Sequence, residues 1–150
     1  MRLAVAGGAI AFVVSALSLS GQTPATSTRA YSEGPVTVMS YVRTKPGMFE
    51  RYMEYLNGQY KQNLEAEKAA GIVLAYTIHT SPPRTPQDHD LILSVTYRNW
   101  AALDGLADRS DAVANRALQS TPRQRDQQFI DRAAMREVLG YRNYQQLLLR

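Results

Sequence analysis

The stretch PVTVMSYVRTKPG, residues 35–47, decides the fold together with the amphipathic run that follows it to Gly71. Its side chains alternate between two faces, as they do along a β-strand, and neither face is wholly polar. Pro46 and Gly47 then break the strand, and a helical pattern begins directly after them. The stretch therefore predicts a β-α unit whose strand is covered on both faces.

The helical run covers residues 48–70. Its apolar residues recur at three- and four-residue steps, which places them on one stripe of a helix: Phe49, Tyr52, Met53, Leu56, Tyr60 and Leu64. Gly58 lies in the middle of this helix, where glycine costs about 1 kcal/mol relative to alanine. We take Gly58 as a sign that the helix approaches a strand closely at this point.

Two further strands are predicted at residues 72–80 and 90–98, which are rich in β-branched and aromatic residues. The connection between them contains three prolines, and its length favours an antiparallel pair. Asn99 has the chemistry of a helix N-cap because its side-chain oxygen can accept a free backbone N–H group. A helix is expected to follow it as far as Leu118, with an irregularity near residues 108–110.

Pro122 interrupts the helical pattern, and a further helix is expected over residues 123–138, with Gly140 ending it. Phe129 and Ile130 are expected to lie in its buried stripe. Residues 144–150 are a candidate fourth strand. The predicted order is β-α-β-β-α-β with an extra helix before the last strand, which is an α+β, ferredoxin-like arrangement with an antiparallel four-stranded sheet.

Length and composition indicate one globular domain, because 150 residues with 45% apolar residues can bury one core and are too few for two ordinary domains. The net charge of +4 is spread along the chain without a basic block, so we expect no nucleic-acid partner. Cysteine is absent from the sequence, which excludes disulfides, thiolate catalysis and cysteine-bound metals.

The first twenty residues, MRLAVAGGAIAFVVSALSLS, have one arginine followed by an uncharged apolar run. This pattern is typical of a secretory signal peptide, with small residues placed for cleavage after residue 20 or residue 30. The alternative is an uncleaved membrane anchor. We therefore expect residues 1–20 to be a signal peptide, 21–33 a flexible linker and 34–150 the domain, in a periplasmic or secreted protein that leaves the membrane once the signal is removed.

Two phrases carry a family resemblance: MSYVRTKPG at residues 39–47, with its tyrosine-rich helix, and VTYRNWAALD at residues 95–104. They resemble the dimeric α/β-barrel superfamily, which includes NIPSNAP-like, EthD-like and antibiotic-biosynthesis-monooxygenase-like proteins. The resemblance covers about residues 36–150, and the chain is similar to small exported members of unknown role. It implies that two four-stranded sheets pair face to face in a homodimer with the helices outside.

The predicted barrel side of the sheet has a mixed polarity, as a pocket wall does. Strands one and three are expected to be parallel neighbours, which would place Arg43 and Arg98 at one end of the sheet beside Tyr41 and Thr96. These four residues form the predicted ligand-binding set, and a carboxylate-bearing ligand would suit them. The alternative is that both arginines reach solvent or pair with acids at a strand end.

Histidine supplies the other candidate groups. His79 is expected at the end of the sheet opposite Arg43, either as a structural residue or as a general base or haem ligand. The segment Asp88-His89-Asp90 matches no standard metal loop, so we expect it to be a solvated loop and predict no metal site. Trp100 is expected to belong to the core.

Three functions remain open from the sequence. The first is a binding module that holds a small, anionic organic ligand in the barrel without a cofactor. The second is an enzyme resembling the cofactor-independent monooxygenases or the haem-degrading members, with His79 or Tyr41 as the working group. The third is a structural dimer without a ligand.

Overall fold

β1, Tyr31–Thr44, is the strand on which the sheet is built, and it has a neighbour on each side. The computed structural model describes residues 29–119 and 121–150. The predicted signal peptide and most of the predicted linker lie outside the described residues. β1 begins at Tyr31, earlier than the expected domain start at residue 34, because its first residues pair with the end of β4.

The elements after β1 are, in order, α1 (Phe49–Tyr55), a π-helical segment (Leu56–Tyr60), α2 (Lys61–Ala69), β2 (Ala75–Thr80), β3 (Leu91–Tyr97), a 3-10 turn (Trp100–Leu103), α3 (Leu106–Leu118), α4 (Pro122–Met135) and β4 (Arg136–Leu149). The four strands form one sheet in the order β2-β3-β1-β4, and all neighbouring pairs are antiparallel. The predicted α+β class with a four-stranded antiparallel sheet is confirmed.

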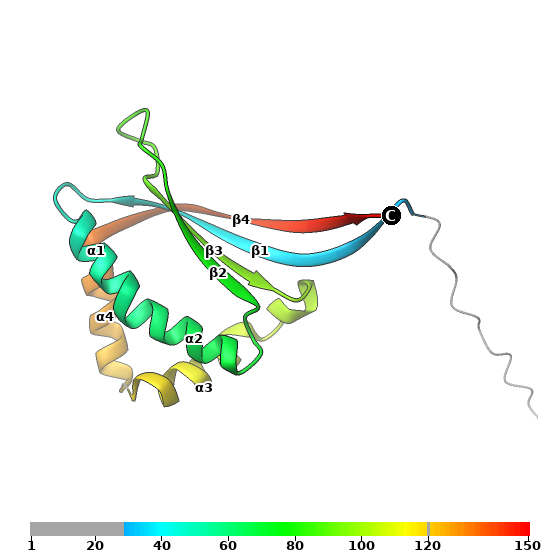
Figure 1. The fold of residues 1–150 in the computed structure, drawn as a ribbon. Helices are drawn as coiled ribbons and strands as arrows, with labels where there is room; N and C mark the ends of the chain where they lie inside the picture. Colours follow the sequence, from blue (N-terminus) through cyan, green and yellow to red (C-terminus); the bar gives the residue numbers. More distant parts are fainter. Residues whose placement is uncertain (1–28, 120) are drawn as a thin grey trace, which may run out of the picture.

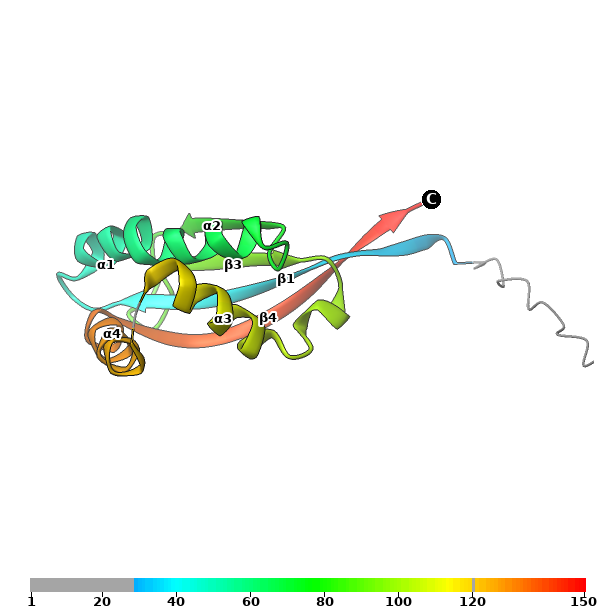
Figure 2. The same cartoon turned by 90° about the horizontal axis from the view of Figure 1, so that it is seen from below.

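The described helices gather on one side of the sheet, and no helix of residues 29–119 or 121–150 covers its other side (Figures 1 and 2). The covered side of the sheet contributes Val42 and Leu91, which are at most 1% exposed and pack against Tyr52 and Leu56 of the first helical run. A second cluster joins Leu64 of α2 to the end of β3. The apolar stripe predicted for the first helix is therefore the stripe that forms the core.

The direction of β3 corrects one expectation. β3 runs antiparallel to β1, with Val36 opposite Tyr97 and Val42 opposite Leu91. The crossover through α1 and α2 makes β2 parallel to β1. β3 then forms an antiparallel hairpin with β2 and lies between β2 and β1, so it is antiparallel to both. The expectation of parallel neighbours was wrong.

The first helical run is not one regular α-helix. A π-helical segment at Leu56–Tyr60 separates α1 from α2. Gly58 lies inside this segment, and a Cβ atom added there would meet no atom within 4 Å. The expectation that Gly58 marks close approach to a strand was therefore wrong.

The helices after β3 follow the prediction in part. The Asn99 side chain accepts the backbone N–H of Ala102 at 3.0 Å, as predicted for an N-cap, but a 3-10 turn follows it and α3 begins only at Leu106. The irregularity lies at Gly105, whose φ of 59° is left-handed, and not at residues 108–110. Trp100 is 45% exposed, so its assignment to the core was wrong.

α4 is exposed along its apolar positions. Phe129 and Ile130 are 65% and 59% exposed, so the prediction that they are buried was wrong. The helix ends at Met135, and Arg136 has extended backbone angles and starts β4, so the predicted helix over residues 123–138 was too long. The chain becomes a strand here because Arg136 and the residues after it pair with the end of β1.

β1 and β4 are longer than the two other strands and continue together as a two-stranded ribbon beyond the sheet (Figure 1). In this ribbon Tyr31 lies opposite Leu149 and Glu33 opposite Leu147. The fourth strand was expected only at residues 144–150, since nothing local in the sequence shows how far its partner extends.

No helix in the described part of the chain is both long and apolar enough to cross a membrane.

Candidate functional site

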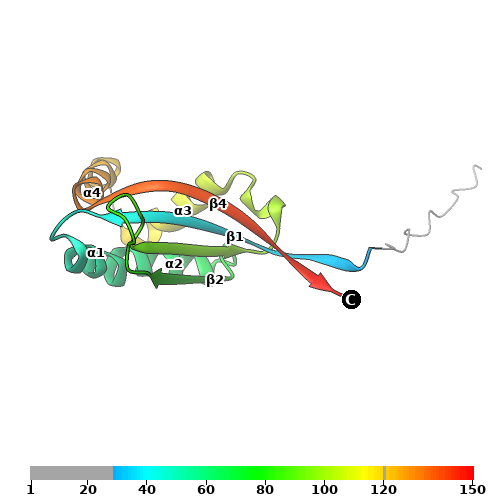
Figure 3. The same cartoon turned by 90° about the horizontal axis from the view of Figure 1, so that it is seen from above.

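The side of the sheet opposite the described helices, which we call the open face, is the candidate site (Figure 3). Cross-strand pairing places its side chains in three rows that run from β4 through β1 and β3 to β2. The rows are Tyr144, Thr37, Thr96 and Ala75; Arg142, Met39, Ser94 and Thr77; and Gly140, Tyr41, Ile92 and His79. The open face is thus of mixed polarity, because its two central strands place Met39 and Ile92 beside the hydroxyl groups of Thr37, Ser94 and Thr96.

A pair of tyrosine hydroxyls lies at the β4 edge of the open face. The hydroxyl oxygens of Tyr41 and Tyr144 are 3.0 Å apart and share a hydrogen bond. Tyr41 lies opposite Gly140, which has no side chain, so its ring can lean across β4 toward Tyr144. On the other side, the ring of Tyr41 meets His89 edge to face, with the ring centroids 5.0 Å apart.

The hydrogen bond makes the two phenols unequal. It lowers the pKa of Tyr144 below its ordinary value, with Arg142 acting in the same direction. The same hydrogen bond raises the pKa of Tyr41. Tyr144 is therefore the phenol that loses its proton more readily, and the pair can exchange a hydrogen bond or a proton with a molecule on this face.

Arg43 lies at the end of β1 and is held by protein groups. Its guanidinium donates to Glu137 at 2.6 Å and to the backbone carbonyl of Pro86 at 2.8 Å. It lines a solvent-open cavity of about 440 Å³ at this end of the sheet. Because Glu137 compensates its charge, Arg43 follows the alternative stated above, in which the arginine pairs with an acid at a strand end.

The neighbouring segment Asp88-His89-Asp90 lies in a loop, as predicted, but its residues are only partly exposed and its two carboxylates are hydrogen-bonded to protein groups. Asp88 accepts the backbone N–H groups of Arg84 and Thr85, which lowers the pKa of its carboxyl. Asp90 accepts both the backbone N–H and the hydroxyl of Thr44. These bonds tie the connection between β2 and β3 to the end of β1 and hold His89 beside Tyr41. No cluster of metal-ligating side chains occurs among the residues that the structure describes.

The predicted ligand-binding set is not brought together. Tyr41 and Arg43 lie toward one end of the sheet, whereas Thr96 and Arg98 lie toward the other, because β1 and β3 run in opposite directions. The Thr96 hydroxyl is bonded to the Thr37 hydroxyl at 2.9 Å, and Arg98 is exposed. The single anion-binding end predicted from two arginines is therefore absent from the described sheet.

His79 shares a row with Tyr41, so its predicted place at the end opposite Arg43 was also wrong. Ile92 lies between the two residues, and two strand spacings of about 4.8 Å separate their backbones by about 10 Å. The His79 ring forms a hydrogen bond with the hydroxyl of Thr77, with 3.2 Å between Nε2 and Oγ1. His79 and Tyr41 can thus contact opposite ends of one small molecule on this face, but they do not contact each other.

The sequence did not predict Tyr144, Arg142, Thr37 or His89 as parts of this site. Tyr144 lies in the predicted fourth strand, yet its bond to Tyr41 joins residues 103 positions apart. The pairing register of β1 with β4 creates this contact, and no local pattern specifies that register across so long a separation.

Comparison with known proteins gives one structural likeness. The sequence matches no protein-family profile and no curated protein. Among solved structures, the crystal structure of HapK from Hahella chejuensis is similar at 13% sequence identity, over 74% of this chain and 91% of that chain, with a TM-score of 0.49.

Proposed function

We propose that this protein is an exported binding module in which two copies pack their open faces together and enclose a small organic ligand. The observation that carries the proposal is the open face itself, a four-stranded surface that lies opposite the described helices and combines Met39 and Ile92 with hydroxyl-bearing side chains. Apolar side chains bordered by polar ones on an uncovered surface often mark an interface or a binding site. A two-fold axis would bring each open face against its equal, as in most homodimers.

The proposed assembly is a dimeric α/β barrel built from two ferredoxin-like subunits. The order of elements and the antiparallel sheet fit this arrangement. The sequence resemblance over residues 36–150 favours it as well. The same resemblance and the apolar run of residues 1–20 underlie the proposed export to the periplasm or the medium.

The ligand is proposed to contact Tyr41, Tyr144 and Arg142. Arg142 supplies a cation on the open face, and the two phenols supply a donor and an acceptor. Arg43 is left out of this set because Glu137 already binds it. A small anionic molecule with an apolar body would match both Arg142 and the mixed polarity of the face.

The test combines oligomeric state with ligand content. Native mass spectrometry of the exported protein should give a dimer, with a mass above that of two chains where the ligand is retained. Met39→Glu places a like charge at the centre of both faces and should give monomers, whereas Ile130→Glu, on exposed α4, should not. A wild-type protein that sediments as a monomer at micromolar concentration contradicts the proposal.

A second candidate is an enzyme of the monooxygenase-like or haem-degrading kind. It is favoured by Tyr144, whose lowered pKa makes it ionise more readily than an ordinary phenol, and by His79 in the same row as Tyr41. Addition of haem to the purified dimer should then produce a shifted absorption band that is lost in His79→Ala or Tyr41→Phe. An unchanged haem spectrum, together with no oxygen consumption when a quinol is added, contradicts this candidate.

A further inference from the structure

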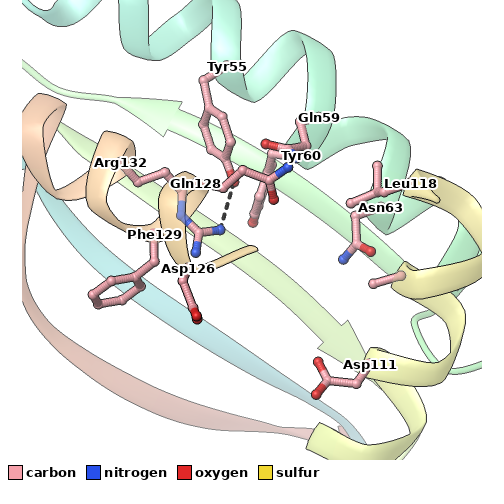
Figure 4. Close-up of a pocket in the computed structure, with 11 residues that line it drawn as sticks. Tyr55, Gln59, Tyr60, Asn63, Asp111, Leu118, Asp126, Gln128, Phe129 and Arg132 are labelled. Carbon is pink, nitrogen blue, oxygen red and sulfur yellow. Dashed lines mark hydrogen bonds between the residues drawn. The ribbon is translucent and has the colours of Figure 1, made fainter. Parts of the chain in front are cut away.

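A second cavity lies on the helix side of the sheet and belongs to one subunit. It has a volume of about 540 Å³ and lies between the π-helical segment, α3 and α4 (Figure 4). Small-molecule sites usually have volumes of about 300–1,000 Å³. Because the sheet separates this cavity from the open face, a ligand here needs no second copy, and the inference does not rest on the proposed function.

The π-helical segment forms one wall of the cavity. Gln59 and Tyr60 of this segment line the cavity, together with Tyr55 at the end of α1 and Asn63 of α2. A π turn accommodates more residues than an α turn, so Tyr60 remains on the same side of the helix as Tyr55 and Gln59. π segments are rare, and they often occur where a helix wall has been reshaped for a function.

Arg132 of α4 is the cationic side chain among the residues that line the cavity. One of its terminal nitrogens, Nη1, donates to the Tyr55 hydroxyl at 3.0 Å, and its guanidinium carbon lies 5.8 Å from the ring centroids of both Tyr55 and Phe129. Figure 4 shows the guanidinium reaching toward Tyr55 across the cavity. Two aromatic rings and one hydrogen bond therefore fix the cation in place.

This cation lacks a counterion in the described part of the chain. Its Nε atom is buried without a hydrogen-bond partner, and no carboxylate lies within the 4.0 Å of a salt bridge. An arginine has five N–H donors, and a partly buried charge is costly unless it is paired. An anion at the free terminal donors would remove this cost, and a carboxylate fits the planar guanidinium best.

The remaining lining defines the rest of the ligand. Phe129, 65% exposed, and Tyr60 offer aromatic surface next to Arg132, and Leu118 adds an aliphatic side chain. Asp126 also lines the cavity and is exposed, so its charge opposes an anion there and opposes a dianion more strongly than a monoanion. These features together favour a planar, aromatic body with a single negative charge.

We infer that this cavity binds a small aromatic monocarboxylate, whose carboxylate pairs with Arg132 and whose ring lies against Phe129 and Tyr60. The probe is 1-naphthoate, titrated into the full-length protein by isothermal calorimetry. Loss of a charged hydrogen bond should weaken binding by about tenfold or more in Arg132→Gln. The matched variant Arg84→Gln, in an exposed loop, should retain the wild-type affinity.

Two further measurements keep the test independent of folding. Phe129→Ala removes an exposed side chain, so the fold should persist while the affinity for 1-naphthoate falls several-fold. The neutral analogue 1-naphthalenemethanol and the dianion phthalate should both bind more weakly than 1-naphthoate. The inference is overturned if 1-naphthoate does not bind at millimolar concentration, or if Arg132→Gln and Phe129→Ala leave its affinity unchanged. Binding lost only in Tyr41→Phe also overturns it and assigns the probe to the open face instead.

Discussion

Gly58→Ala is expected to stabilise the protein, although Gly58 lies in an unusual part of a helix. Its φ is outside the left-handed range, and the added methyl group would meet no atom within 4 Å. The higher helix propensity of alanine should therefore raise the free energy of unfolding by about 0.5–1 kcal/mol, because the added methyl group has no steric cost. For a chain of 150 residues this corresponds to a rise in melting temperature of roughly 1–4 °C.

Thermal unfolding followed by far-ultraviolet circular dichroism would measure this shift at a fixed protein concentration. Gly71→Ala is the matched control, because Gly71 has a φ of 72° and should lose stability when it gains a side chain. If Gly58→Ala lowered the melting temperature while Gly71→Ala lost stability as expected, the prediction that alanine fits at position 58 would be refuted. That result would mean that another molecule approaches Gly58 closely in the assembled protein.

Tyr41→Phe removes the hydroxyl group whose hydrogen bond lowers the pKa of Tyr144, so the Tyr144 pKa should rise toward the ordinary phenol value in an alkaline titration followed by tyrosinate absorbance; an unchanged titration curve contradicts this cause. Burial raises the pKa of Glu67, so the folded state holds its proton more tightly than the unfolded state, and stability falls as pH rises from the ordinary carboxyl pKa through the raised one. Glu67→Gln should therefore raise the melting temperature at neutral pH, and a gain that does not shrink in acid would count against this explanation. Gln119→Gly should stabilise the protein by about 1 kcal/mol in chemical denaturation, because Gln119 has a φ of 47° at the end of α3, and a lower stability would show that its side chain makes a compensating contact.

Local patterns predicted the parts of the fold that depend on neighbouring residues. Alternation along β1 placed Val36 and Val42 on the buried side, and the three- and four-residue steps placed Tyr52 and Leu56 in the core. The Asn99 cap was predicted because its bond spans only three residues. In each case one element and its adjacent turn contain the information.

The parts that depend on distant pairing were not predicted. The direction of β3 separates Arg43 from Arg98, and the register of β4 brings Tyr144 to Tyr41. The amphipathic pattern of α4 gave no sign that Phe129 is exposed, because periodicity shows which residues share a face and not whether another element covers that face. The candidate site is therefore largely a product of strand order and register.

The ribbon formed by β1 and β4 has a mechanical consequence. The ends of the two strands lie side by side at its tip, where the backbone N–H of Arg150 donates to the carbonyl of Ala30 at 3.0 Å. A force that pulls these two ends apart acts along the cross-strand hydrogen bonds, which lie perpendicular to the strands. The hydrogen bonds would then break sequentially, starting at the tip. Separating β4 from β1 in this direction should therefore need a far lower force than shearing the two strands past each other.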